Sequence, residues 1–376
     1  MGDLLATVII PNYNGRKWLP RLMASLAEQT EPRFATSVVD DASQDDSVAY
    51  LRANWPAVEV VRNEHNRGFA ATCNVGMQAA PTPFVVLLNN DTHVDRNWMA
   101  EGLRAFDSPT VGSAASLVLL AEAPHLIDTA GDLYSVAGGA VKRGHGRPRE
   151  FAATLGRDVL SASGASAFYR REAVAEAGWL DETFESYYED VDLGFRLAWA
   201  GYRCVFAPAS ICYHHLSSSY NSRGWRYHYN SARNAEVVWW ANMPERLRRR
   251  HLPAHAAFLL LQGLNKLRQG CIVPHAAGKW AALRRAAEIH RKRAETIRLA
   301  RAPGSVGPPR PTTETDQSQH RRGTARPEGR GSSNGGVAPP RPTNPEAVIE
   351  ALLVRDWWGL HVRSRLPRLG ESEAAE

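Results

Sequence analysis

The sequence is poor in cysteine and has no long apolar run. Its 376 residues include only four cysteines, none in a C-x-x-C pair: Cys73, Cys204, Cys212 and Cys271. This usage argues against zinc fingers and a disulfide framework, and it predicts a reducing, cytoplasmic location. The longest apolar run, near Ala256 to Leu261, is far shorter than the roughly 20 residues that cross a bilayer. No charged segment followed by an apolar one begins the chain, so no secretion signal is predicted.

Basic charge is concentrated in one part of the chain. The formal net charge is +6, yet residues 245–301 alone contain 14 Lys and Arg against 3 Asp and Glu. Such a segment suits an anionic surface, either phospholipid headgroups or a nucleic acid. We expect residues 224–301 to form a basic helical extension. Residues 302–345, dense in Pro, Gly, Ser and Arg, are predicted to be a disordered linker before a short C-terminal helix and tail over 346–376.

Short β-branched runs alternate with helical periodicity in the N-terminal part. Strands are predicted at 7–11, 36–39, 58–61, 83–88 and 202–206, and helices at 19–29, 47–53, 68–79 and from Glu189 onward. This alternation is typical of an α/β fold with a mostly parallel sheet flanked by helices. We expect it to make up a catalytic domain over residues 1–223.

Each of the first four predicted strands is followed by a polar cluster. Asn12 follows the first strand, Asp41 the second, Asn66 the third and Asp91 the fourth. In open parallel sheets the ligand crevice lies beyond the carboxyl ends of the strands. The sequence therefore predicts one site at this edge.

Six segments carry a family resemblance. In order they are TVIIPNYNG, VVDDAS, NRGFAATCNVG, LLNNDT, YYEDVDLGFR and YHHLSSS. Together they resemble the family-2 inverting glycosyltransferases of the GT-A fold, in particular the bacterial rhamnosyltransferase-like branch, over about residues 5–240. The resemblance implies transfer from a nucleotide-diphosphate sugar to a saccharide or lipid-linked acceptor in cell-envelope polysaccharide synthesis. The branch favours dTDP-rhamnose as the donor, and UDP- and GDP-sugars remain open.

The resemblance gives Asp41 the role of binding the nucleobase of the donor. The matching acid accepts a hydrogen bond from the pyrimidine N–H, which an ionised carboxylate does well. The alternative is a turn or helix cap. Six further residues are assigned to the nucleotide-sugar site: Pro11, Asn12, Tyr13, Asn66, Arg67 and Gly68.

A divalent cation is expected at the segment Asn89-Asn90-Asp91. It stands where the family has its D-x-D motif, from which position 89 departs because it is Asn. Asp91 is predicted to hold Mg²⁺ or Mn²⁺ against the donor diphosphate, with Asn89 and Asn90 beside the nucleotide sugar. His214 matches a histidine that completes the metal shell in some relatives, and His215 is its rival. The alternatives are an ordinary loop and structural histidines.

The pair Glu189-Asp190 matches the catalytic acids of the family. Inversion by one displacement needs a base that takes the proton of the acceptor hydroxyl. Asp190 is predicted to be that base, while Glu189 and Asp192 orient the base or the acceptor. Acids in a first helical turn are also good capping residues, which is the alternative. Arg233-Asn234 resembles a further pair of this branch, with no role assigned.

Other classes fit less well. A Rossmann dehydrogenase needs G-x-G-x-x-G after the first strand, where this chain has PNYNG. A nucleotidyltransferase, the nearer rival, usually shows a Gly-rich basic loop there. A nucleic-acid-binding protein would leave the acidic clusters unexplained, so no nucleic-acid partner is expected. The basic helices, with Phe258–Leu261 and Trp280, either lie peripherally on the inner face of the cell membrane or form a solvated face packed on the catalytic domain.

Overall fold

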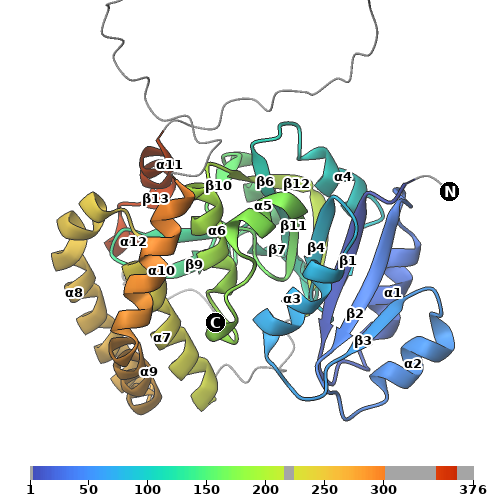
Figure 1. Cartoon of the computed structure of the whole chain (residues 1–376), viewed down its shortest axis with the longest axis horizontal. Helices are drawn as coiled ribbons and strands as arrows, with labels where there is room; N and C mark the ends of the chain where they lie inside the picture. The colour runs from blue at the N-terminus through green and yellow to red at the C-terminus, as the bar shows by residue number, and fades with distance from the viewer. Residues whose placement is uncertain (1–2, 216–223, 301–343, 362–376) are drawn as a thin grey trace, which may run out of the picture.

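A ten-stranded mixed sheet forms the centre of the part of the chain that the computed structural model describes, residues 3–215, 224–300 and 344–361 (Figure 1). Its strands are β1 (Ala6–Asn12), β2 (Phe34–Asp40), β3 (Glu59–Arg62), β4 (Phe84–Leu88), β5 (Thr92–Val94), β6 (Val111–Leu120), β7 (Ala123–Thr129), β10 (Asp158–Val159), β11 (Ser166–Arg170) and β12 (Arg203–His214). The main path runs β10-β12-β6-β11-β4-β1-β2-β3, with β5 paired to β12 and β7 to β6. On this path only β10 and β11 are antiparallel to their neighbours.

The predicted α/β class and mostly parallel sheet are confirmed. Strands β1 to β4 lie within two residues of their predicted limits. The strand predicted at 202–206 is too short, because β12 continues to His214. A register shift between Ala207 and Ile211 carries the strand past Pro208, after which pairing with β6 resumes.

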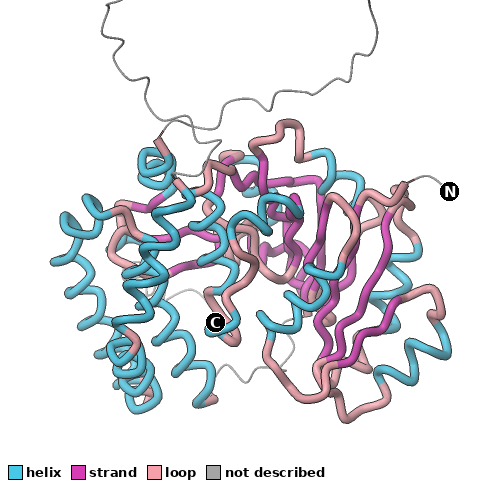
Figure 2. Tube along the Cα trace, in the orientation of Figure 1, coloured by secondary structure: helices cyan, strands magenta, loops and turns pink. Residues whose placement is uncertain are grey.

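Helices cover both faces of the sheet (Figure 2). They are α1 (Leu19–Ala27), α2 (Ser47–Asn54), α3 (Phe69–Ala79), α4 (Trp98–Arg104), α5 (Arg171–Ala177) and α6 (Glu189–Trp199). Successive side chains of a strand point to opposite faces, and β1 shows this directly. Ile9 packs with residues of α3, α5 and α6, whereas Val8 and Ile10 pack with residues of α1 and α4. The sheet is therefore buried on both sides, and its polar residues gather at the strand ends.

The segment after residue 223 is helical, as predicted, and it shares a core with the sheet domain. Its helices are α7 (Trp225–Asn242), α8 (Glu245–Arg268), α9 (Ile272–Arg284) and α10 (Ala286–Leu299). Phe195 of α6, Trp239 of α7 and Ile289 of α10 belong to one buried cluster. Helices α7 and α9 approach closely at Gly278, where a Cβ atom would lie 2.3 Å from the carbonyl oxygen of Tyr229.

The C-terminal part of the described chain also joins this core. It consists of α11 (Pro345–Leu352), β13 (Leu353–Val354) and α12 (Trp357–His361). Strand β13 pairs with β8 (Asp132–Ser135), which in turn pairs with β9 (Ala140–Lys142). Residues 302–343 of the predicted linker and 362–376 of the predicted tail lie outside the described residues, so the disorder of the linker stays a prediction.

Candidate functional site

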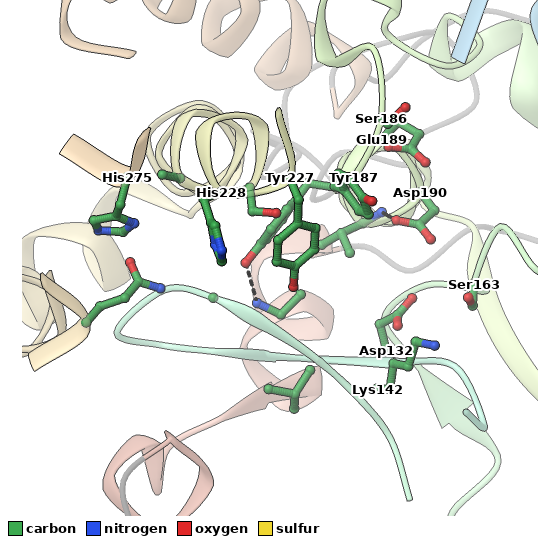
Figure 3. A pocket seen from close by; sticks show the side chains of 18 of the residues that line it. Asp132, Lys142, Ser163, Ser186, Tyr187, Glu189, Asp190, Tyr227, His228 and His275 are labelled. Carbon is green, nitrogen blue, oxygen red and sulfur yellow. Dashed lines mark hydrogen bonds between the residues drawn. The ribbon is translucent and has the colours of Figure 1, made fainter. Parts of the chain in front are cut away.

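A cleft of about 670 Å³ opens at the carboxyl edge of the sheet. Asn89 after β4 and His214 at the end of β12 line it together with the first turn of α6, and α7 and α8 form its opposite wall. Figure 3 shows Glu189 and Asp190 on one side, Asp132 and Lys142 across from them, and His228 toward the C-terminal helices. The volume of the cleft is in the range of small-molecule sites.

Asp41 organises the turn that leads into α3. Its Oδ1 accepts hydrogen bonds from Asn63 Nδ2 and from the backbone N–H of Arg67, both at 2.8 Å, and its Oδ2 accepts one from Gly68 N at 3.0 Å. Gly68 has φ +85°, which favours glycine, and a Cβ atom there would lie 3.3 Å from the carbonyl oxygen of Glu185. A carboxylate has about four acceptor positions, so Oδ2 keeps capacity for a ligand. The nucleobase contact of Asp41 stays a prediction.

Asn12 and Asn90 link the ends of neighbouring strands. Asn12 Nδ2 donates to Asp40 Oδ1 at 3.0 Å and to Ser43 Oγ at 3.2 Å, and Asn90 Nδ2 donates to Asn12 Oδ1 at 2.9 Å. Asn12 is buried, and these bonds use both N–H groups and one acceptor position of its amide. Both residues therefore have a structural role in shaping the edge of the site, and their contact with a nucleotide stays a prediction.

The other residues predicted to bind the nucleotide-sugar donor differ in burial and in their contacts. Tyr13 is exposed and Pro11 is half-buried. Arg67 is occupied by Glu182, with Nη2 and Oε2 3.3 Å apart. Asn66 Nδ2 lies 3.5 Å from the carbonyl oxygen of Asp41. The structure thus brings the turn 66–68 to Asp41. The guanidinium of Arg67 pairs with Glu182, so its contact with a diphosphate stays a prediction.

Asp91 and His214 lie side by side, as a shared metal site requires. His214 Nε2 is 3.3 Å from Asp91 Oδ1, and His214 Nδ1 is 2.9 Å from Asp128 Oδ2. Burial alone would lower the pKa of His214, but its hydrogen bonds to Asp128 and Asp91 outweigh burial and raise the pKa to about 9. His215 points elsewhere: its Nδ1 is 2.9 Å from Glu122 Oε1. The geometry favours His214 over its rival.

Asp128 is a site residue that the sequence interpretation missed. Its buried carboxylate accepts hydrogen bonds from Lys142 Nζ at 2.7 and 2.9 Å and lies 3.4 Å from His145 Nδ1. Burial would raise the pKa of Asp128, but the hydrogen bonds from His145 and His214 and the charge of Lys142 hold that pKa well below its ordinary value. No motif marks these residues, because Asp128 and His214 are 86 positions apart.

The donor set fits a divalent cation. A metal-binding histidine usually gives its second nitrogen to a carboxylate, as His214 does to Asp128. The buried Oδ1 of Asn89 has no hydrogen-bond partner among the described groups. Residues 3–215, 224–300 and 344–361 contain no cluster of three or more His, Cys, Asp or Glu that would hold a metal alone. Asp91 and His214 would therefore need oxygen ligands from a bound diphosphate.

Three carboxyl groups meet at the start of α6. Asp190 Oδ2 accepts a hydrogen bond from Gly164 N at 3.0 Å and its Oδ1 one from Val191 N at 2.8 Å. Burial raises the pKa of Asp190, and these two bonds oppose that rise. Burial and the neighbouring Asp190 raise the pKa values of Glu189 and Asp132 well above their ordinary range. The two bonds from Gly164 and Val191 stabilise the negative charge of Asp190.

Asp192 has a different role from its neighbours. Its Oδ2 accepts a hydrogen bond from Arg196 Nε and its Oδ1 one from Asn242 Nδ2, both at 2.7 Å. The side chain is buried and joins α6 to α7. It does not line the cleft.

The N-terminal part of the chain is similar to known proteins. Residues 7–178 match the family model described as Glycosyl transferase family 2. The chain is 32% identical over 211 residues to a pre-mycofactocin glycosyltransferase of Mycobacterium tuberculosis, a match that covers 55% of this chain and only 42% of that protein. It is 26% identical to the N-acetylglucosaminyl-diphospho-decaprenol L-rhamnosyltransferase of the same organism, over 58% of this chain and 78% of that protein.

Two solved structures share the fold. One is the mannosyltransferase PcManGT from Pyrobaculum calidifontis in complex with GDP-Man and Mn²⁺, with TM-score 0.50, 18% identity, and coverage of 80% of this chain and 86% of that one. The other is S. aureus TarS in complex with UDP, with TM-score 0.50, 18% identity, and coverage of 79% and 89%. These likenesses show the GT-A fold alone. The family match alone identifies residues 7–178 as a glycosyl transferase family 2 domain.

Proposed function

We propose that this protein is an inverting glycosyltransferase that transfers a sugar from a nucleotide-diphosphate sugar to a saccharide or lipid-linked acceptor. The observation that carries the proposal is the cleft lined by both Asp190 and His214, the second of which contacts Asp91 behind it. Asp190 takes the proton of the acceptor hydroxyl, whose oxygen bonds to the anomeric carbon as the bond to the diphosphate breaks. A cation held by Asp91 and His214, Mg²⁺ or Mn²⁺, would neutralise the departing diphosphate.

The proposed donor and pathway have support from the relatives. One relative is named as an L-rhamnosyltransferase that acts on a diphospho-decaprenol acceptor, and this supports dTDP-rhamnose as donor and a role in cell-envelope polysaccharide synthesis. One structural neighbour contains GDP-Man and another UDP, so three nucleotides remain to be compared.

A donor screen tests the proposal. The full chain is incubated with dTDP-rhamnose, UDP-GlcNAc or GDP-mannose, with Mn²⁺ or with a chelator, and with a short-chain prenyl-diphospho-GlcNAc as acceptor. We expect one donor to release nucleoside diphosphate in an acceptor-dependent and Mn²⁺-dependent manner. If none of the three nucleoside diphosphates binds in the presence of Mn²⁺, the assignment of the donor site is wrong.

Exposed apolar side chains gather on α8 and α9. Leu260, Leu264 and Leu267 are spaced by four and three residues, so they lie on one face of α8. On α9, Trp280 and Leu283 are likewise exposed. Leu264, with 47% of its surface exposed, also lines the cleft. The apolar face therefore reaches the mouth of the site.

This face supports peripheral contact with the inner face of the cell membrane. The exposed Arg268 and Arg284 flank it and would meet anionic headgroups while the apolar side chains insert shallowly. Among the described helices, none is long and apolar enough to span a membrane. A lipid-linked acceptor would then enter the cleft from the membrane surface.

Charge on the apolar face should weaken vesicle binding. We expect the double variant Leu264→Glu and Trp280→Glu to bind vesicles of phosphatidylglycerol and phosphatidylcholine at least about tenfold more weakly in sedimentation, because a charged side chain resists insertion. Leu4→Glu is the control, since Leu4 is 44% exposed and directly precedes β1, a strand that lies on the opposite side of the molecule from α8 (Figure 1). Equal binding of all three proteins, or a preference for DNA over vesicles, contradicts the membrane interpretation.

A further inference from the structure

The backbone directly before the catalytic acids adopts rare conformations. Glu185 has φ 62° and ψ −63°, and Ser186 N donates to the carbonyl oxygen of Phe184 at 2.7 Å, which makes a γ-turn with positive φ. Tyr187 and Tyr188 both have φ 72°. L side chains rarely adopt such values, and they persist only where surrounding contacts enforce them. The segment ends at Glu189, where α6 begins.

The enforcing contacts come from Asn234 on α7. Its Nδ2, with two N–H groups to share, lies within hydrogen-bond distance of three carbonyl oxygens of the segment, those of Phe184 at 3.0 Å, Ser186 at 3.0 Å and Tyr187 at 2.8 Å. Asn234 is 1% exposed, so water does not compete for these bonds. A single amide thus holds both sides of the γ-turn.

Arg233 completes the contact and orients the amide. Its Nε donates to Asn234 Oδ1 at 2.9 Å, which fixes the Asn234 NH₂ group toward the segment. Its Nη2 donates to the carbonyl oxygens of Thr183 at 3.1 Å and Phe184 at 3.0 Å, and its Nη1 lies 3.3 Å from Glu185 Oε1. The two adjacent side chains therefore form one clamp, which we define as Arg233 and Asn234.

The other side of the segment contacts the donor turn. The carbonyl oxygen of Glu185 accepts a hydrogen bond from Ala70 N at 3.2 Å, in the first turn of α3. The preceding Gly68 donates to Asp41. The segment 183–188 therefore lies between the turn at Asp41 and helix α7, and it leads into Asp190.

We propose that the clamp of Arg233 and Asn234 is a positioning device for the base. It holds the segment 183–188 in its rare conformation and thereby sets Asp190 relative to the donor turn. The clamp lies on α7, so the C-terminal helices contribute to catalysis as well as to the cleft wall. This inference rests on the proposed glycosyltransferase function, in which Asp190 is the base.

Two substitutions at Asn234 test the clamp against a matched control. Asn234→Ala removes the amide, and Asn234→Asp keeps its shape but cannot donate hydrogen bonds. Asn230→Ala is the control, because Asn230 lies one turn earlier on α7, is also 1% exposed, and its Nδ2 has no partner among the described groups. All variants are purified as the full chain. Hydrogen–deuterium exchange of peptides covering 180–192, the stoichiometry of nucleoside diphosphate binding with Mn²⁺, and nucleoside diphosphate release are measured.

We expect both Asn234 variants to exchange faster at 180–192 and to lose about 100-fold in kcat, as small displacements of catalytic groups do. The binding stoichiometry should stay at the wild-type value, which a merely unfolded fraction would lower. The Asn230 variant should match the wild type in all three measurements.

Two results would overturn the inference. Unchanged exchange in the Asn234 variants would show that the segment does not depend on the clamp. Faster exchange with kcat equal to that of Asn230→Ala would show that the segment does not position the base. Failure of the proposed function is seen separately, as absence of nucleoside diphosphate release by the wild type with every donor.

Discussion

Replacing Asp190 with asparagine should reduce sugar transfer by about 10²- to 10⁴-fold, the usual contribution of a positioned general base. The asparagine amide cannot take up the proton of the acceptor hydroxyl. Asp190 is chosen over its neighbours because Gly164 N and Val191 N both donate to it, while Glu189 Oε2 has no partner among the described groups. A carboxylate that must ionise in a buried site needs such bonds.

The pH dependence of turnover gives the same prediction a second test. Burial raises the pKa of Asp190, so turnover should fall as the pH drops through a value above the ordinary carboxyl range of about 4. Burial and the nearby Asp190 raise the pKa of Glu189, which favours its protonated form. Glu189→Gln keeps the shape of that form and should cost less than about tenfold, with the acid limb retained.

The binding stoichiometry of nucleoside diphosphate controls for folding. Asparagine can accept only one of the two backbone hydrogen bonds that Asp190 accepts, so the thermal midpoint is measured alongside. A loss of turnover in Glu189→Gln together with activity in Asp190→Asn would make Glu189 the base instead.

The sequence predicts what depends on local pattern. Strands β1 to β4 follow from β-branched runs that stop at Asn12, Asp41 and Asn89, and a parallel sheet brings such stops to one edge. The register confirms the placement, since Asn12 lies opposite Asp40 and Asp40 opposite Arg62. The start of α6 at Glu189 also follows from local pattern, because acidic residues fill the first turn of the helix.

The parts that the sequence did not reveal depend on contacts between distant segments. Asp128 acquires its role only when β7 and β12 bring it against His214. Arg233 and Asn234 contact carbonyl groups nearly fifty residues earlier. Every residue has a backbone carbonyl, so the sequence does not indicate which ones these side chains contact. Asn12 is the reverse case: its position was predicted, but its bond to Asn90 assigns it to the frame of the site.

Replacing Asp91 with asparagine should abolish the contribution of Mn²⁺ to nucleoside diphosphate binding. Asp91 is the one carboxylate of the segment 89–91, and its Oδ1 lies 3.3 Å from His214 Nε2. Removing that charge takes away the only anionic protein ligand assigned to the cation. We expect the apparent Mn²⁺ affinity, titrated calorimetrically in the presence of the tightest-binding nucleoside diphosphate, to fall by more than about 100-fold, beyond the usual cost of losing a supporting contact.

A graded series separates ligands from supports. Asp128→Asn should weaken Mn²⁺ binding by about 10- to 100-fold, because His214 loses the carboxylate that orients its ring. His214→Gln should resemble Asp91→Asn. His215→Gln is the matched control: its ring stacks on Trp18 and its Nδ1 faces Glu122, so Mn²⁺ binding should stay at the wild-type value.

The chelator decides whether the cation is needed at all. If nucleoside diphosphate binds the wild type equally well with Mn²⁺ and with EDTA, Asp91 and His214 are not metal ligands. The replacement of an acid by Asn89 in the metal motif would then reflect the absence of a metal requirement. Their contact would then be an ion pair, since the raised pKa of His214, about 9, keeps the imidazole protonated between Asp91 and Asp128. In that case Asp91→Asn should lower the thermal midpoint without changing nucleotide affinity, because a buried cation would lose one of its partners. The two models therefore differ for Asp91→Asn: a metal site predicts weaker Mn²⁺-dependent nucleotide binding, whereas an ion pair predicts a lower thermal midpoint with unchanged nucleotide affinity.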